Sequence, residues 1–149
     1  MVACLTIGSL LKNPHSPSGP VAPGVRLFEL AIVNVPIFRL AAALGFLAVA
    51  LGAFGAHALK GTLQSNATTA VWETAVLCHF IHVVVLLVLA TQPGASRAIS
   101  SLFVAGIVLF SGSLYLLALT NVKWIGAITP LGGLCFLAGW LCLVIWPPR

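Results

Sequence analysis

The chain has 149 residues, of which 60% are hydrophobic and 6% are charged, against about a quarter charged in typical soluble domains. Its formal charge of +5 at pH 7 comes from seven Lys or Arg and two acidic residues that are scattered singly. This pattern excludes the clustered basic face of a nucleic-acid-binding protein. A soluble fold of this size would lack the polar residues to cover its surface, so the composition predicts a protein whose partner is the lipid bilayer.

The first part of the chain differs from the rest. Residues 1–36 are predicted to form an N-terminal extension, within which residues 13–24 hold four Pro, two Gly and two Ser. That composition is typical of a disordered linker. The apolar stretch 25–35 is too short to cross a bilayer. Residues 37–149 are predicted to form the membrane domain.

Four stretches of the membrane domain contain no charged residue and are 20 to 25 residues long. A bilayer core about 30 Å thick needs roughly 20 apolar residues of helix, so each stretch suffices for one crossing and none for two. The sequence predicts an all-α, integral membrane four-helix bundle with spans at about 38–59, 69–91, 98–120 and 124–146.

The first and fourth predicted spans have distinctive small residues and breakers. In the first, Gly and Ala recur at steps of three or four and share one helical face, which favours close packing with another helix in this chain, in a homo-oligomer or in a larger membrane complex. They are Ala41, Gly45, Ala48, Gly52 and Ala56. The fourth has Trp124 and Trp146 as interfacial anchors, and Pro130 within it predicts a kink.

The basic residues predict an orientation. An even number of spans places both termini on one side of the membrane, and the side with more Lys and Arg is usually the cytoplasmic one. Five basic residues share the side of the termini, against Lys60 and Lys123 on the other side. The prediction is therefore N-in and C-in, from Lys12, Arg26, Arg39, Arg97 and Arg149.

Four segments carry a resemblance to a known family. They are LGAFGAHALK at 51–60, WETAVLCHFIH at 72–82, LFSGSLYLLAL at 109–119 and ITPLGGLCFLAGW at 128–140. Together they resemble the small four-span membrane proteins of domain-of-unknown-function family 423, to which transmembrane protein 256 is related. The resemblance implies a multi-pass protein of the bacterial inner membrane, and it implies no activity.

Polar residues within the spans are candidate functional groups, because hydrocarbon penalises them. His57 and Glu73 are expected at similar depth near one end of the first hairpin. They form either a proton-binding or solute-binding pair at a cavity mouth or an interfacial pair that closes the hairpin.

His79 and His82 are three residues apart on one helical face and must turn towards protein or water. Imidazoles at this depth suggest either a metal or haem site or hydrogen bonds to hydroxyls of neighbouring helices. No further ligand is expected at the same depth, so we predict no metal site and no cofactor. Ser111 and Tyr115 share a face of the third span and offer such hydroxyls.

Two functions remain open at this point. The first is a structural or accessory membrane component, and the alternative is a small-solute or proton pathway. An enzyme ranks last, because no nucleophile elbow, oxyanion loop or placed carboxylate accompanies the serines and histidines. Convergence of the six candidate side chains on one cavity would favour the pathway, whereas separate pairing would favour the accessory component. The six are His57, Glu73, His79, His82, Ser111 and Tyr115.

Overall fold

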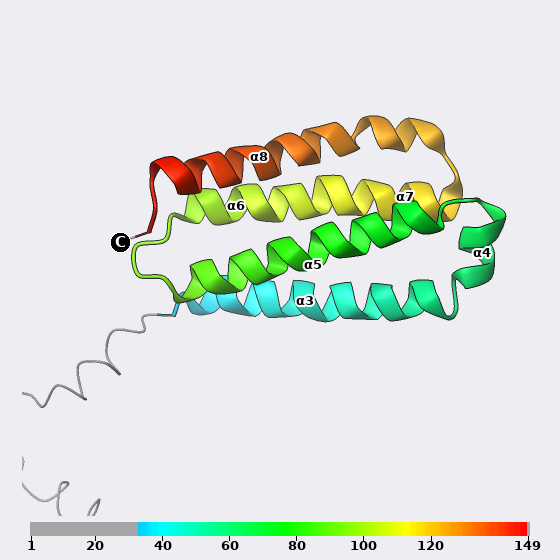
Figure 1. The fold of residues 1–149 in the computed structure, drawn as a ribbon. Helices are drawn as coiled ribbons and strands as arrows, with labels where there is room; N and C mark the ends of the chain where they lie inside the picture. Colours follow the sequence, from blue (N-terminus) through cyan, green and yellow to red (C-terminus); the bar gives the residue numbers. More distant parts are fainter. Residues whose placement is uncertain (1–32, 149) are drawn as a thin grey trace, which may run out of the picture. The chain divides into compact units, whose positions relative to one another are not determined.

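Four apolar helical segments run side by side along the molecule (Figure 1). The computed structural model describes residues 33–148, and the predicted extension lies almost wholly outside them. Each segment is long and apolar enough to cross a membrane, as the charge-free stretches predicted, and residues 33–148 contain no strand. The segments are Val35–Ala56, Thr69–Thr91, Arg97–Thr120 and Lys123–Ile145.

Only the first two spans are continuous α-helices. They are α3 (Val35–Ala56) and α5 (Thr69–Thr91), joined by the short helix α4 (Lys60–Ser65). The third span consists of α6 (Arg97–Gly106), the π-helical turn η1 (Ile107–Ser111) and α7 (Gly112–Thr120). The fourth consists of the 3₁₀ turn η2 (Lys123–Ala127) followed by α8 (Thr129–Ile145).

The start of the first span and the position of Pro130 within the fourth differ from the prediction. The first span begins at Val35 and not near residue 38, since the Asn34 side chain accepts a hydrogen bond from the amide of Ile37 at 3.4 Å and caps the helix. Pro36 lies in the first turn of α3. Backbone N–H groups in the first turn have no acceptor within the helix, so a proline there costs no hydrogen bond. Pro130 likewise lies in the first turn of α8, after the 3₁₀ turn, and not in the interior of a regular helix.

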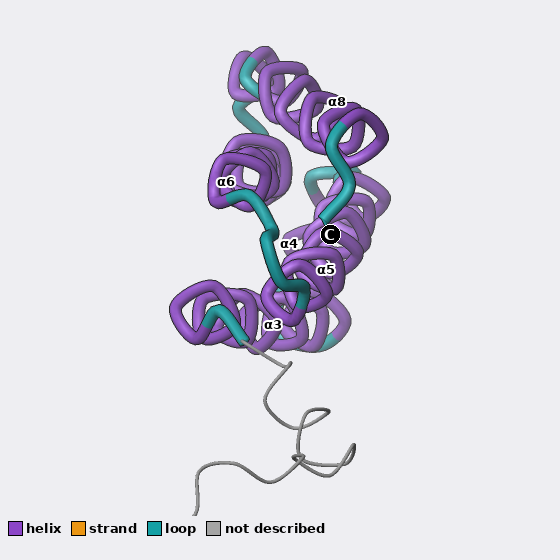
Figure 2. Tube along the Cα trace, turned by 90° about the vertical axis from the view of Figure 1, so that its left-hand side faces the viewer, coloured by secondary structure: helices purple, strands orange, loops and turns teal. Residues whose placement is uncertain are grey.

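The helices pack mainly with their neighbours in the sequence. α5 lies between α3 on one side and the third span on the other, and α8 packs against α6 and η1 (Figure 2). In the most apolar windows of the second and third spans 39% of the residues are buried, against 11% in the first and 17% in the fourth. The outer helices α3 and α8 therefore expose most of their length to lipid.

α3 meets α5 through its small residues. Ala41 and Ala48 are fully buried, and a Cβ added to Gly45 would lie 3.2 Å from the Val83 side chain. Gly55, which packs against Trp72, is the last small residue of this face, whereas Ala56, which was predicted to belong to it, is exposed. The small-residue face of the first span is thus filled by α5 of the same chain and needs no outside helix.

α8 approaches the third span through glycines as well. A Cβ at Gly139 would lie 3.0 Å from the Phe103 ring, and one at Gly106 would overlap Phe136. At Gly132 an added Cβ would overlap the backbone of Phe110, in the middle of the π turn. Backbone-to-backbone contact at this point therefore sets the distance between the last two spans.

A substitution at Gly132 tests this contact. We expect Gly132→Ala to lower the thermal midpoint of the detergent-solubilised protein, at a cost of about 1–3 kcal/mol, because the new methyl group forces α8 away from η1. Gly133→Ala is the matched control, since its Cβ would make only ordinary contacts with Phe110 at 3.8 Å. Equal midpoints for the two variants would contradict the close approach at Gly132.

Candidate functional site

His82 is enclosed by aromatic side chains from two other helices. Its ring stacks on Phe136 of α8, with ring centres 3.5 Å apart and planes only 6° from parallel. Phe103 of α6 lies 5.7 Å away, and the indole N–H of Trp140 donates to Nε2 of His82 at 3.3 Å. Nδ1 lies 2.7 Å from the backbone carbonyl of Cys78. His82 thus connects α5, α6 and α8.

These two hydrogen bonds define the state of the imidazole. A carbonyl only accepts, so Nδ1 of His82 carries the proton and donates to Cys78. An indole N–H only donates, so Nε2 is the unprotonated acceptor for Trp140. His82 is therefore the neutral Nδ1–H tautomer with both nitrogens occupied. Protonation or metal binding at Nε2 would require the Trp140 bond to break.

His79 belongs to a separate cluster one turn closer to α4. Its Nδ1 lies 3.3 Å from the hydroxyl of Tyr115 in α7. The Tyr115 ring packs on the Trp72 ring, with their centres 4.8 Å apart. The indole N–H of Trp72 in turn donates to the carbonyl of Leu51 in α3 at 3.1 Å. The cluster connects α3, α5 and α7, as the His82 cluster connects α5, α6 and α8.

Two buried polar atoms have no hydrogen-bond partner within residues 33–148. They are Nε2 of His79 and the hydroxyl of Ser111, the last residue of the π turn. A buried polar atom without a hydrogen-bond partner lowers the stability of the fold, because its desolvation is not compensated. No group of three or more His, Cys, Asp or Glu in this part of the chain is placed to hold a metal ion.

The last two spans are joined by a pair of hydroxyls. Ser113 of α7 and Thr129 of α8 lie 2.8 Å apart, and Ser113 also donates to the carbonyl of Phe110 in the π turn at 2.9 Å. Both bonds lie beside the close approach at Gly132. Ser113 is thus occupied by a structural contact, and its hydroxyl has no histidine partner.

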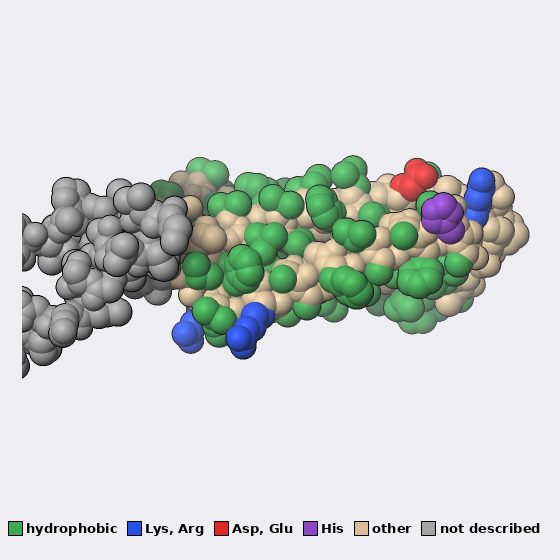
Figure 3. Space-filling model, turned by 90° about the horizontal axis from the view of Figure 1, so that it is seen from below, with side chains coloured by type: hydrophobic (Ala, Val, Ile, Leu, Met, Phe, Trp, Pro, Cys, Tyr) green, Lys and Arg blue, Asp and Glu red, His purple; other side chains and the backbone are tan. Residues whose placement is uncertain are grey.

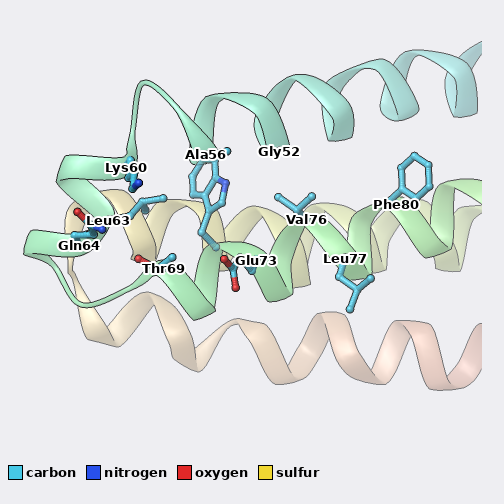
Figure 4. A pocket seen from close by; sticks show the side chains of 12 residues that line it. Gly52, Ala56, Lys60, Leu63, Gln64, Thr69, Glu73, Val76, Leu77 and Phe80 are labelled. Carbon is cyan, nitrogen blue, oxygen red and sulfur yellow. The ribbon is translucent and has the colours of Figure 1, made fainter.

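A pocket of about 470 Å³ lies between α3, α4 and α5 at the end of the molecule that carries α4. We call this end, with Lys60, Glu73 and Lys123, the α4 end. Four polar residues line the pocket together with apolar ones (Figure 4). The polar ones are Lys60, Gln64, Thr69 and Glu73.

The wall formed by α4 is fixed to the far end of the third span. Leu63 is buried with 1% exposure, and Asn66 donates to the carbonyls of Ala118 and Leu119 at 3.1 Å. The hydroxyl of Thr68 donates to the Ala118 carbonyl at 2.8 Å. These carbonyls belong to the last turn of α7, where helical partners are missing. The connection between α3 and α5 is therefore an ordered part of the bundle.

The charged side chains gather at the two ends of the molecule. Figure 3 shows hydrophobic side chains over the middle of one face, with basic side chains towards both ends and the acidic and histidine side chains towards one. His57 is exposed beyond the last residue of α3 and is not among the residues that line the pocket. Its predicted contact with Glu73 stays a prediction.

The six candidate residues thus occupy different places. His79 and Tyr115 share a hydrogen bond, and Ser111 lies one helical turn before Tyr115 with its hydroxyl unpaired. His82 is in its own aromatic enclosure. His57 and Glu73 are exposed at the α4 end, and of the six only Glu73 lines the pocket.

Sequence reasoning missed several residues that build these clusters. Phe136 and Trp140 surround His82, and their spacing of four, on the same face as Gly132 and Gly139, was the available signal. Lys60 was interpreted only as a marker of orientation, although it lines the pocket with Glu73 and Gln64. No signal in the sequence alone brought those three together.

The chain is similar to a family described as "Protein of unknown function (DUF423)", whose sequence pattern matches residues 51–133. UPF0382 membrane protein YwdK of Bacillus subtilis is 46% identical over 105 residues, covering 66% of this chain and 85% of the relative. UPF0382 inner membrane protein YgdD of Escherichia coli K12 is 43% identical over 111 residues, covering 70% and 83%. No solved structure matches the chain significantly.

The His82 enclosure leads to a stability prediction. We expect His82→Ala to lower the thermal midpoint in detergent far more than Cys135→Ala, by about 2–4 kcal/mol against less than 1, because it leaves a cavity and the indole N–H of Trp140 without an acceptor. Trp140→Phe, which removes that donor and makes the ring system smaller but keeps an aromatic side chain, should fall between the two. Equal midpoints for all three would contradict the bonded enclosure.

Proposed function

The chain belongs to the DUF423 family, and its relatives are named as membrane proteins. We propose that it has a structural or accessory role in the membrane. In this role the chain is a multi-pass bundle that associates through its outer helix α8 with a second copy or with another membrane chain. It neither catalyses a reaction nor conducts a solute.

The observation that supports this proposal is the separate pairing of the polar side chains. A pathway needs polar groups that follow one another along a continuous cavity. Here His79 bonds to Tyr115, His82 bonds to Trp140, and Ser113 bonds to Thr129. Each pair joins two different helices, which is the usual use of polar residues in membrane bundles.

The outer side of α8 offers a surface for association. Large apolar side chains follow one another there at steps of three and four, so they form a ridge on one helical face. All are more than half exposed, although the face of α8 that contacts the third span is closely packed. The ridge consists of Leu134, Leu137, Leu141 and Val144.

Photo-crosslinking tests the ridge. A photoreactive residue placed at Leu137, 67% exposed on α8, should give a discrete protein adduct in native membranes. The same residue at Phe46, 77% exposed on α3, is the control and should react only with lipid. Replacing Leu134 and Leu141 by Ala should weaken the adduct at Leu137, because both lie on the same face. Failure to obtain any adduct at Leu137 would contradict association through this ridge.

A flux measurement tests the absence of a pathway. Liposomes that contain the purified protein should lose an imposed pH gradient no faster than empty liposomes, because His79 and His82 are bonded in two separate pairs. Protein-dependent decay that His79→Phe or His82→Phe abolishes would overturn the accessory role and establish the pathway.

A further inference from the structure

The pocket at the α4 end changes character along its length. Lys60 and Glu73 lie in its polar part, and Val76, Leu77 and Phe80 follow along α5 (Figure 4). From residue 69 to residue 80 the helix rises by about 16 Å. The lining therefore passes from the charged end of the molecule into the apolar region that hydrocarbon surrounds. A ligand that matches it needs a polar head and an apolar chain.

We propose that this pocket binds one phospholipid whose headgroup carries a phosphate and a primary ammonium. The phosphate binds the Lys60 ammonium, and the headgroup ammonium binds the Glu73 carboxylate. The first part of one acyl chain lies over Val76, Leu77 and Phe80. This binding is a property of the pocket and does not depend on the accessory role.

The opening of the pocket suits a ligand that arrives from the bilayer. Leu77 is 60% exposed and Phe80 is 46% exposed, so the apolar part of the lining faces the lipid side of α5. A volume of about 470 Å³ lies within the range of ligand pockets, roughly 300–1,000 Å³. The pocket holds a headgroup and the start of a chain, while the rest of the lipid stays in the membrane.

The walls of the pocket are formed before any ligand arrives. Gly52 and Ala56 contribute no side chain beyond a methyl group to the α3 wall, and Gly55 lets the Trp72 indole pack directly against it. Trp72 is held by its bond to the Leu51 carbonyl and by the Tyr115 ring. Binding to preformed walls costs little ordering entropy.

The charges select the class of headgroup. An anionic lipid would satisfy Lys60 and leave Glu73 facing a like charge, whereas a zwitterionic headgroup satisfies both. Quaternary ammonium groups are recognised by exposed aromatic faces. Neither aromatic ring of the lining is placed for this, because Trp72 is only 2% exposed and Phe80 lies about two turns deeper than Glu73. The cation therefore binds the Glu73 carboxylate, which favours an ammonium group that donates hydrogen bonds.

Native mass spectrometry of the full chain tests the proposal, using nanodiscs with equal amounts of phosphatidylethanolamine, phosphatidylcholine and phosphatidylglycerol. We expect one retained phosphatidylethanolamine, bound about tenfold more tightly than phosphatidylcholine. Glu73→Gln should abolish that preference, Lys60→Gln should weaken the binding of both lipids, and Ala56→Leu should fill the pocket and reduce all binding. Lys123→Gln and Ala53→Leu, which change exposed residues outside the lining, are the matched controls.

A measurement on the unchanged protein guards against variants that fail to fold. Short-chain phosphatidylethanolamine should raise the thermal midpoint of the wild-type chain in detergent, and the phosphatidylcholine analogue should raise it less. Equal retention of the two zwitterionic lipids, a preference for phosphatidylglycerol, or unchanged binding by Ala56→Leu would each overturn the proposal. A preference for the anionic lipid would identify general attraction to basic residues as the only interaction at this end.

Discussion

Hydrocarbon contains no water to replace a missing hydrogen bond, so each buried polar group of a membrane protein must find its partner within the protein. His82 satisfies this requirement with both ring nitrogens, one at the Cys78 carbonyl and one at the Trp140 indole. Asn66 and Thr68 satisfy it for the last carbonyls of α7. The same constraint explains why most buried polar side chains of the described residues occur as pairs, with Nε2 of His79 and the hydroxyl of Ser111 as the exceptions. The pairs His79–Tyr115, His82–Trp140 and Ser113–Thr129 each also join two neighbouring helices.

Close backbone approach supplies the other part of the stability. Apolar side chains gain little by leaving lipid for another apolar surface, so helices in a membrane associate through dense contacts. Gly45 and Gly52 let α3 approach Val83 and Val76 of α5, and Gly132 brings α8 against the backbone of the third span. The two contact regions lie on opposite sides of the central pair of helices, which explains why α3 and α8 remain largely exposed.

The number and approximate limits of the spans were predictable because charge and hydropathy are properties of the local sequence. The π turn was not, since Ile107–Ser111 has no feature that separates it from an ordinary apolar helix, and its position opposite Gly132 depends on α8. His79 and Tyr115 were both candidates, but the partner of His82 lies 58 residues further along the chain. The pocket depends on α4, whose six residues are too few to show a period.

The π turn has a consequence for how the third span serves its neighbours. Each additional residue in a helix rotates everything after it by about 100°. Before the turn, Phe103 and Gly106 contact α8, and after it, Tyr115 contacts Trp72 and His79 of α5. In an uninterrupted α-helix one of these two sets would be turned by about 100° from the position that it has here. The π turn thus adjusts the rotation between the two halves of a single crossing, so that α6 packs its glycine and Phe103 against α8 while α7 directs Tyr115 to α5 and Ser113 to Thr129 of α8.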